Sequence, residues 1–179
     1  NESKVSINLN KIVDKKKKLW SAFIRSNKKI QLEQNIYLKN SIYCKVIEIK
    51  KEKNYVSYII KFSLRYLDLI EFLNSHGNIP LPAYIKKKRL INQSDIKNYQ
   101  TIFADKIGAV AAPTASLHFT KRLIDKIKKK GINIITLTLH VNGGTFLPIK
   151  SNVVEDHLMH FEKGVITQES ASKINYFKK

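Results

Sequence analysis

The stretch AVAAPTASLHFTKRLIDKIKKKGINIITLTLHV, residues 109–141, decides the expected fold, because apolar runs flank a helical pattern within it. The short apolar run 109–112 is followed by a loop and by a helical segment, Thr120–Lys130, which Gly131 closes. The second apolar run, 132–141, is typical of a buried strand. This order predicts a β-α-β unit with two parallel strands, as found in α/β domains.

The predicted unit also predicts a site. In a parallel unit the loops after both strands emerge at one edge of the sheet, where open α/β sheets bind ligands. The residues in these loops are Thr114 and His118, after the first strand, and His140, Gly143, Gly144 and Thr145, at the end of the second. We expect them to face one crevice. There the two histidines either move protons, since imidazole titrates near neutral pH, or are ordinary hydrogen-bonded histidines of the core or loops. The two glycines either let backbone amides approach a ligand closely or form an ordinary tight turn.

The part of the chain before residue 62 has a different pattern. Val5, Ile7 and Leu9 alternate with polar residues, as in a half-buried strand. The β-rich runs 41–49 and 55–62 are separated by a loop of hairpin length, and 19–24 and 36–38 are weaker strands. These patterns predict a small antiparallel sheet or barrel, which a short helix over residues 64–73 with Ser63 as its N-cap follows.

Beyond that helix, Pro80 and Pro82 predict an extended strap over residues 76–85, since proline restricts itself and the residue before it. A helix capped by Ser94 or Asp95 and a final helix over 167–179 are expected further on. The predicted fold class is therefore α/β plus β: a small antiparallel β-barrel domain, residues 1–73, joined to a partial α/β catalytic domain, residues 74–179, that contains the parallel β-α-β unit. A chain that begins inside a strand pattern and ends on an amphipathic helix is expected to be a piece of a longer protein.

The densest group of titratable residues is EDHLMHFE, residues 155–162. If it is a strand, His160 and Glu162 share one face and His157 lies on the other, whereas a helix brings the two histidines together. A carboxylate beside an imidazole suits acid–base chemistry. The alternatives are a metal site with His157, His160 and Glu162 as ligands, although the spacing is not that of the helical zinc motif, and a plain polar surface.

The amino-acid composition limits the kinds of protein to which this chain can belong. The 33 Lys and Arg residues against 14 Asp and Glu give a net charge of +19, which suits a nucleic-acid ligand but also fits a lysine-rich codon bias. The densest basic clusters are Lys15–Lys18, 86–89 and 128–130. One cysteine, Cys44, excludes an internal disulfide, and no stretch approaches the roughly 20 apolar residues of a membrane helix. With no secretory signal visible, we expect a cytoplasmic, monomeric protein without a membrane partner.

Five runs in this order carry a resemblance that covers essentially the whole chain. They are HGNIPLPAYI (76–85), YQTIFA (99–104), GAVAAPTASLHFT (108–120), TLHVNGGTFLPI (138–149) and EDHLMHFE (155–162). These runs resemble the S-adenosylmethionine:tRNA ribosyltransferase-isomerase family of queuosine biosynthesis. The resemblance implies a β-barrel domain inserted into an α/β domain, and family members extend beyond both ends of this chain.

The resemblance also implies an activity. The ribosyl group of S-adenosylmethionine is transferred to the aminomethyl group of a 7-deazaguanine at the tRNA wobble position and rearranged to an epoxycyclopentane, while adenine and methionine leave. S-adenosylmethionine and tRNA are the implied partners, with no metal or second cofactor. The alternatives are a non-catalytic basic RNA-binding module, an inactive remnant of the enzyme, and a metal-dependent hydrolase.

Residue roles follow from the same resemblance. The implied proton-transfer or orienting residues are His118, His140, His160 and Glu162, and the implied substrate contacts are Thr114, Gly143, Gly144, Thr145, Asp156 and His157. Asp156 and His157 belong to the cluster that is expected to border the tRNA base. The family usually has glycine where this chain has Asn142, which we expect to reshape the ligand turn.

Overall fold

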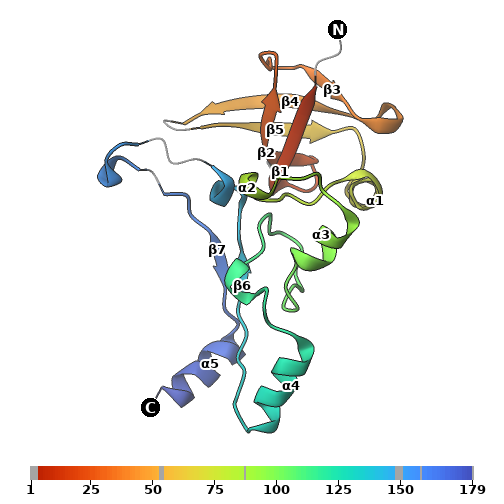
Figure 1. The fold of residues 1–179 in the computed structure, drawn as a ribbon. Helices are drawn as coiled ribbons and strands as arrows, with labels where there is room; N and C mark the ends of the chain where they lie inside the picture. Colours follow the sequence, from red (N-terminus) through yellow and green to blue (C-terminus); the bar gives the residue numbers. More distant parts are fainter. Residues whose placement is uncertain (1–3, 53–54, 87, 148–150, 158, 179) are drawn as a thin grey trace.

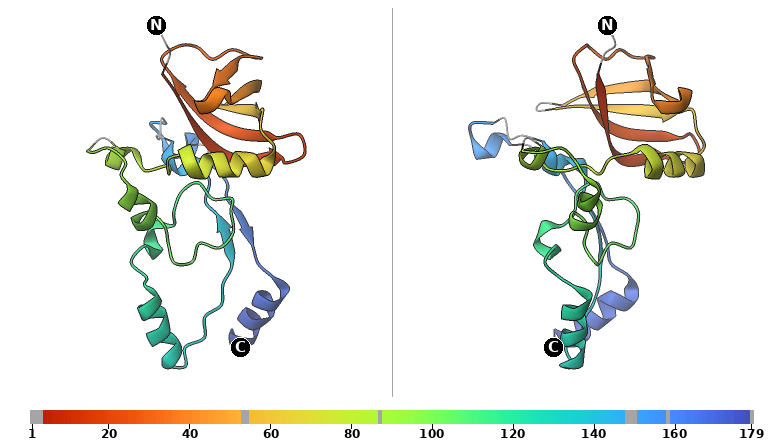
Figure 2. Two further views of the ribbon diagram at one scale, coloured as in Figure 1. Left: turned by 90° about the vertical axis from the view of Figure 1, so that its right-hand side faces the viewer. Right: turned by 45° about the vertical axis from the view of Figure 1, so that its right-hand side comes forward.

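The computed structural model describes residues 4–52, 55–86, 88–147, 151–157 and 159–178 (Figure 1). A curled sheet forms one end of the molecule, and a small two-stranded sheet with short helices extends away from it. The first strand belongs to the curled sheet, while the last helix lies at the opposite end, as Figure 2 shows from two further sides.

The curled sheet confirms the strands expected in the first 62 residues. Across the sheet the order is β1 (Val5–Asp14), β2 (Leu19–Ser26), β5 (Val56–Phe62), β4 (Tyr43–Lys51) and β3 (Asn35–Tyr37), and every neighbouring pair is antiparallel. The edge strands β1 and β3 do not pair with each other, so the sheet is a half-barrel and not the closed barrel expected. A reason is the length of β3, whose three residues present few backbone groups to a further strand.

The core of the molecule lies on the concave side of this sheet. Its buried members are Trp20, Ala22, Ile30, Ile36, Cys44, Val46, Ile60, Phe62 and Leu69. The indole of Trp20 stacks on Tyr66, with ring centroids 6.4 Å apart, and meets Phe62 edge-on. Since burying apolar side chains is the main favourable contribution to folding, this cluster is the principal source of stability.

Helix α1 (Tyr66–His76) covers the open side of the curled sheet (Figure 2) and buries Leu69 against it. The expected helix is therefore present, but its N-cap is Arg65 and not Ser63. The hydroxyl of Ser63 instead accepts a hydrogen bond from the backbone N–H of Tyr43, at 3.3 Å. Ser63 thus connects the end of β5 to the start of β4, and the helix begins after it.

The remaining helices are short: α2 (Ala83–Lys86), α3 (Gln93–Asn98), α4 (Lys121–Lys129) and α5 (Gln168–Phe177). Helix α2 begins directly after Pro82, inside the strap expected to be extended, because proline is tolerated at a helix start. Helix α4 is the one expected over Thr120–Lys130, with Thr120 as N-cap and Gly131 at φ +72° beyond its end. Within the described ranges, no helix has the length and apolar character needed to cross a bilayer.

The parallel β-α-β unit is not confirmed. Residues 109–112 form no strand, and the expected strand 132–141 is reduced to β6 (Thr138–His140). Strand β6 pairs antiparallel with β7 (Lys163–Val165). Two backbone hydrogen bonds join the run 109–112 to the carbonyl of Val141, which follows β6: one from Val110 N at 2.7 Å and one from Ala111 N at 3.3 Å. Its alanines supply none of the bulky side chains that stabilise a strand, which explains why the apolar run remains a loop.

Candidate active site

The 3₁₀ turn Gly143–Phe146, called the glycine turn below, follows β6 and lies against β1. Its N-cap, Asn142, accepts a hydrogen bond from Gly144 N through its side-chain oxygen, at 2.7 Å. The backbone N–H of Gly143 donates to the side-chain oxygen of Asn10 in β1, also at 2.7 Å. The turn is therefore held by two asparagine side chains, one of them 133 residues away in the sequence.

The two glycines form a tight turn, which is one of the two alternatives expected for them, and contact with a ligand stays a prediction. Their amides already donate to the side chains of Asn10 and Asn142. Among the described glycines, positive φ occurs at Gly108 and Gly131 and not in the glycine turn. Glycine is needed for space: a Cβ at Gly143 would lie 3.0 Å from the Phe23 ring, and one at Gly144 would lie 2.4 Å from Cγ of His160. Asn142 caps the turn, and the reshaping of the turn expected at this position stays a prediction.

His160 lies directly on the glycine turn, between two of the residues predicted for the site. Its Nε2 is 3.5 Å from Oγ1 of Thr145 and 3.8 Å from Oε1 of Glu162. The His160 and Glu162 side chains are each about one quarter exposed, so both are reachable from solvent. An imidazole flanked by a hydroxyl and a carboxylate can accept a proton and be stabilised as the cation by that carboxylate.

His140 occupies a different position, at the end of β6 and against Gly108. A Cβ at Gly108 would lie 2.8 Å from Nδ1 of His140, and the backbone there is at φ +143°, which favours glycine. Nδ1 of His140 is buried and has no hydrogen-bond partner in the described part of the chain. A buried imidazole nitrogen without a partner calls for an explanation, and a bound substrate group would supply one.

Thr114 and His118 belong to the loop after residue 112. Thr114 begins the short 3₁₀ turn Thr114–Ser116, and both side chains are exposed. The ring of His118 lies against that of its neighbour Phe119, with centroids 4.6 Å apart. No hydrogen bond or ring contact among the described residues joins Thr114 or His118 to His140. The convergence expected from a parallel unit therefore stays a prediction.

Asp156 and His157 precede His160, which lies in the segment before β7 and belongs to neither the strand nor the helix weighed for residues 155–162. Asp156 ends the 3₁₀ turn Val154–Asp156 and is exposed, while Nδ1 of His157 is buried without a hydrogen-bond partner in the described ranges. The metal alternative has no support here, since the described residues include no group of three or more His, Cys, Asp or Glu side chains placed to hold an ion.

A groove of about 990 Å³ lies between β1, β3, the end of α1 and the residues that follow it. Its described lining includes Phe72, His76 and Ile79 but none of the predicted site residues. Of the predicted residues, Thr145, His160 and Glu162 lie together at the glycine turn, and a site formed with the others stays a prediction.

The sequence analysis missed three residues that shape this site: Asn10, Lys11 and Phe161. Nδ2 of Asn142 donates to the carbonyl of Phe161, and Nζ of Lys11 lies 5.4 Å from the centroid of the Phe161 ring. A signal was present in β1, where apolar residues fall at odd positions through Leu9 and then at both Ile12 and Val13. Such a break in the alternation is typical of a β-bulge, and bulges often redirect side chains beside functional sites.

Comparisons with known proteins identify relatives of the chain. Residues 1–179 match the family model described as queuosine biosynthesis protein. A protein of Zymomonas mobilis is 39% identical over 180 residues, covering 100% of this chain and 51% of the relative. Proteins of Rickettsia bellii and Methylocella silvestris are 41% and 43% identical, covering 89% and 88% of this chain and 44% of each relative. All three are named S-adenosylmethionine:tRNA ribosyltransferase-isomerase, and the chain spans about half the length of these curated relatives.

Proposed function

The chain belongs to the queuosine biosynthesis protein family, and from that premise we propose that it forms part of an S-adenosylmethionine:tRNA ribosyltransferase-isomerase. The proposed reaction moves the ribosyl group of S-adenosylmethionine onto the aminomethyl group of wobble 7-aminomethyl-7-deazaguanine, giving epoxyqueuosine. Adenine and methionine leave. The names of the relatives and the family support the enzyme class, and the protein is expected to act as a cytoplasmic monomer.

The observation that carries the proposal is the position of His160 between Thr145 and Glu162, over Gly144. An aminomethyl group is protonated at neutral pH and must lose a proton before its nitrogen can form a bond to the ribosyl carbon. His160 would accept that proton, and Glu162 would stabilise the imidazolium. S-adenosylmethionine supplies the reactive ribosyl carbon. The remaining task of the protein is to hold the aminomethyl nitrogen in line with that carbon.

The other predicted residues support the same proposal with separate roles. Thr145 would orient His160 through its hydroxyl, and the carboxylate of Glu162 also suits the positive charge of a sulfonium donor. His140 offers its unpartnered Nδ1 to substrate. His118 is proposed as a further proton-transfer or orienting residue and Thr114 as a substrate contact, while Asp156 and His157 are proposed to border the tRNA base.

The net positive charge of the chain supports tRNA as its partner. The turn Lys15–Lys18 joins β1 to β2, and Nζ of Lys15 lies 4.1 Å from the Tyr66 ring centroid. With a net charge of +19, binding to a polyanion should weaken steeply as salt rises, because phosphate contacts release counterions.

The test incubates the chain with S-adenosylmethionine and with tRNA that carries the aminomethyl base, and then measures released adenine and the epoxide nucleoside by mass spectrometry. His160→Ala should abolish product, while His76→Ala, on the exposed end of α1, is the matched control. Equal product from both variants would remove the role of His160. Salt-sensitive tRNA binding without any product in the unaltered chain would favour the non-catalytic RNA-binding module instead.

A further inference from the structure

Asn10 lies where β1 departs from regular pairing with β2. Leu9 pairs with Ala22 and Lys11 pairs with Ser21, so Asn10 is an extra residue in a β-bulge. A bulge turns the side chain of its extra residue out of the regular alternation. Here the redirected amide oxygen accepts the hydrogen bond from Gly143 N.

Gly143 is closely packed against two residues of the curled sheet, Asn10 and Phe23. Gly143 is buried, and a Cβ at this position would lie 3.2 Å from Oδ1 of Asn10 and 3.0 Å from the ring of Phe23 in β2. The glycine turn is thus pressed against the curled sheet and fixed there by one directed bond. A buried amide deprived of this acceptor would be left without a partner, which is costly.

The same strand also contacts the second half of the site. Nζ of Lys11 lies over the ring of Phe161, which stands between His160 and Glu162 in the sequence. The carbonyl of Phe161 accepts from the side chain of Asn142, the N-cap of the glycine turn. Strand β1 therefore holds both the turn that carries Thr145 and the segment that carries His160.

From these contacts we propose that Asn10 is a positioning residue. Through Gly143 it sets the distance between Thr145 and His160, and it thereby makes the curled sheet part of the site that binds S-adenosylmethionine. The inference rests on the proposed function, in which these residues act on the substrate. Asn10 touches no reacting atom, and its effect passes through the backbone of the glycine turn.

The test compares three variants of the full 179-residue chain. Asn10→Ala removes the acceptor, Asn10→Asp keeps an oxygen that accepts from Gly143 N, and Asn8→Ala removes an amide from the same strand without touching the turn. Asn142–Gly143 is the only Asn-Gly pair in the sequence, so ¹³C-carbonyl asparagine with ¹⁵N-glycine selects the Gly143 amide by NMR.

We expect the Gly143 amide to exchange with solvent at least about tenfold faster in Asn10→Ala, with protection restored in Asn10→Asp and unchanged in Asn8→Ala. The Kd for S-adenosylmethionine, or the KM for it in turnover, should rise about tenfold in Asn10→Ala alone, while the affinity for tRNA stays unchanged.

Two results would overturn the inference, and a third concerns its premise. Unchanged exchange at Gly143 in Asn10→Ala would show that Asn10 does not fix the turn. Faster exchange with unchanged donor affinity would show that the turn does not position the donor, while the proposed function stands. If the unaltered chain binds no S-adenosylmethionine, the proposed function fails for this chain, and the donor-site role of Asn10 fails with it.

Discussion

Gly144 and His160 make the closest approach in the candidate site, because a Cβ at Gly144 would lie 2.4 Å from Cγ of His160. Gly144→Ala must therefore displace the ring or the turn. We expect turnover to fall about a hundredfold, since small misplacements of reacting groups carry penalties of that order. Overpacking should also lower the free energy of unfolding by about 1–3 kcal/mol. Steady-state release of adenine and a denaturant titration measure the two effects.

Gly164→Ala is the matched control for this prediction, because nothing lies within 4 Å of a Cβ built at Gly164 in β7. It should leave turnover and stability close to those of the unaltered chain. An equal loss of turnover in both variants would contradict the assignment, since the effect would then follow from replacing glycine and not from moving His160.

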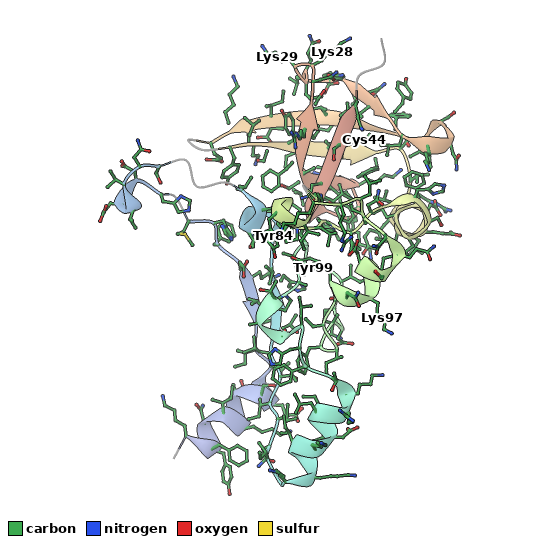
Figure 3. The ribbon with its side chains drawn as sticks, in the orientation of Figure 1. Lys28, Lys29, Cys44, Tyr84, Lys97 and Tyr99 are labelled. Carbon is green, nitrogen blue, oxygen red and sulfur yellow. The ribbon has the colours of Figure 1, made fainter. Side chains whose placement is uncertain are left out.

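Cys44 lies fully buried within the curled sheet (Figure 3), and burial raises the pKa of its thiol to about 12. Only the thiolate attacks disulfide reagents, so the native thiol should not react with DTNB at pH 8. In the unfolded chain the pKa returns to about 8.5, which makes the thiol reactive there. Because the unfolded state loses its proton first, this group also lowers stability as the pH rises above about 8.5. Rapid stoichiometric reaction in native buffer would contradict the buried position.

Helix α3 depends on a charged pair and a capping box at its start. Asp95 is buried, and the pKa of its carboxyl is lowered to about 2, first by hydrogen bonds from Arg89 and then by one from Asn92 N. Since this pKa lies below the unfolded value of about 3.9, the carboxylate stabilises the folded state at pH 4 and above. That contribution is lost as the pH falls through about 2.

The corresponding variant is Asp95→Asn. We expect it to be less stable than the unaltered chain near pH 6, with the difference shrinking as the pH falls from about 4 toward about 2. Asp125→Asn, on the exposed face of α4, is the control for replacing an exposed carboxylate. Urea titrations across this pH range measure both variants. A constant difference for Asp95→Asn at every pH would mean that the charge is not its source.

Elements with strong local patterns could be predicted from the sequence, and those built by distant contacts could not. Strands β4 and β5 have alternation and a hairpin loop, and α4 has its cap and closing glycine. Strands β6 and β7 have three residues each and pair across a long loop, so neither has a period long enough to detect. The pairing of His160 with Glu162 follows from their spacing, whereas the bond from Gly143 to Asn10 depends on a bulge 133 residues away.

Apolar burial is unevenly divided over the molecule. The core cluster lies in the curled sheet and α1, up to His76. Beyond His76, the buried apolar side chains in the described ranges are Leu81, Pro82, Ala111 and Val141. Around the two-stranded sheet, Leu137, Leu139, Val165 and Ile166 are exposed. Because the part of the chain beyond His76 buries so little apolar surface, its own packing offsets little of the conformational entropy that is lost on folding.

This division predicts unfolding in two steps, while the expected domain boundary between residues 73 and 74, which falls inside α1, stays a prediction. Trp20 is the only tryptophan and belongs to the core of the curled sheet, so its fluorescence reports on that part alone. Far-UV circular dichroism also follows α4 and α5, and we expect it to change at lower urea concentration than the fluorescence. Ile60→Ala, at a fully buried position, should lower the stability of the Trp20 transition by about 2–5 kcal/mol and leave the first transition in place. Coincident transitions, shifted together by Ile60→Ala, would show instead that the contact of the glycine turn with β1 couples the two parts into one cooperative unit.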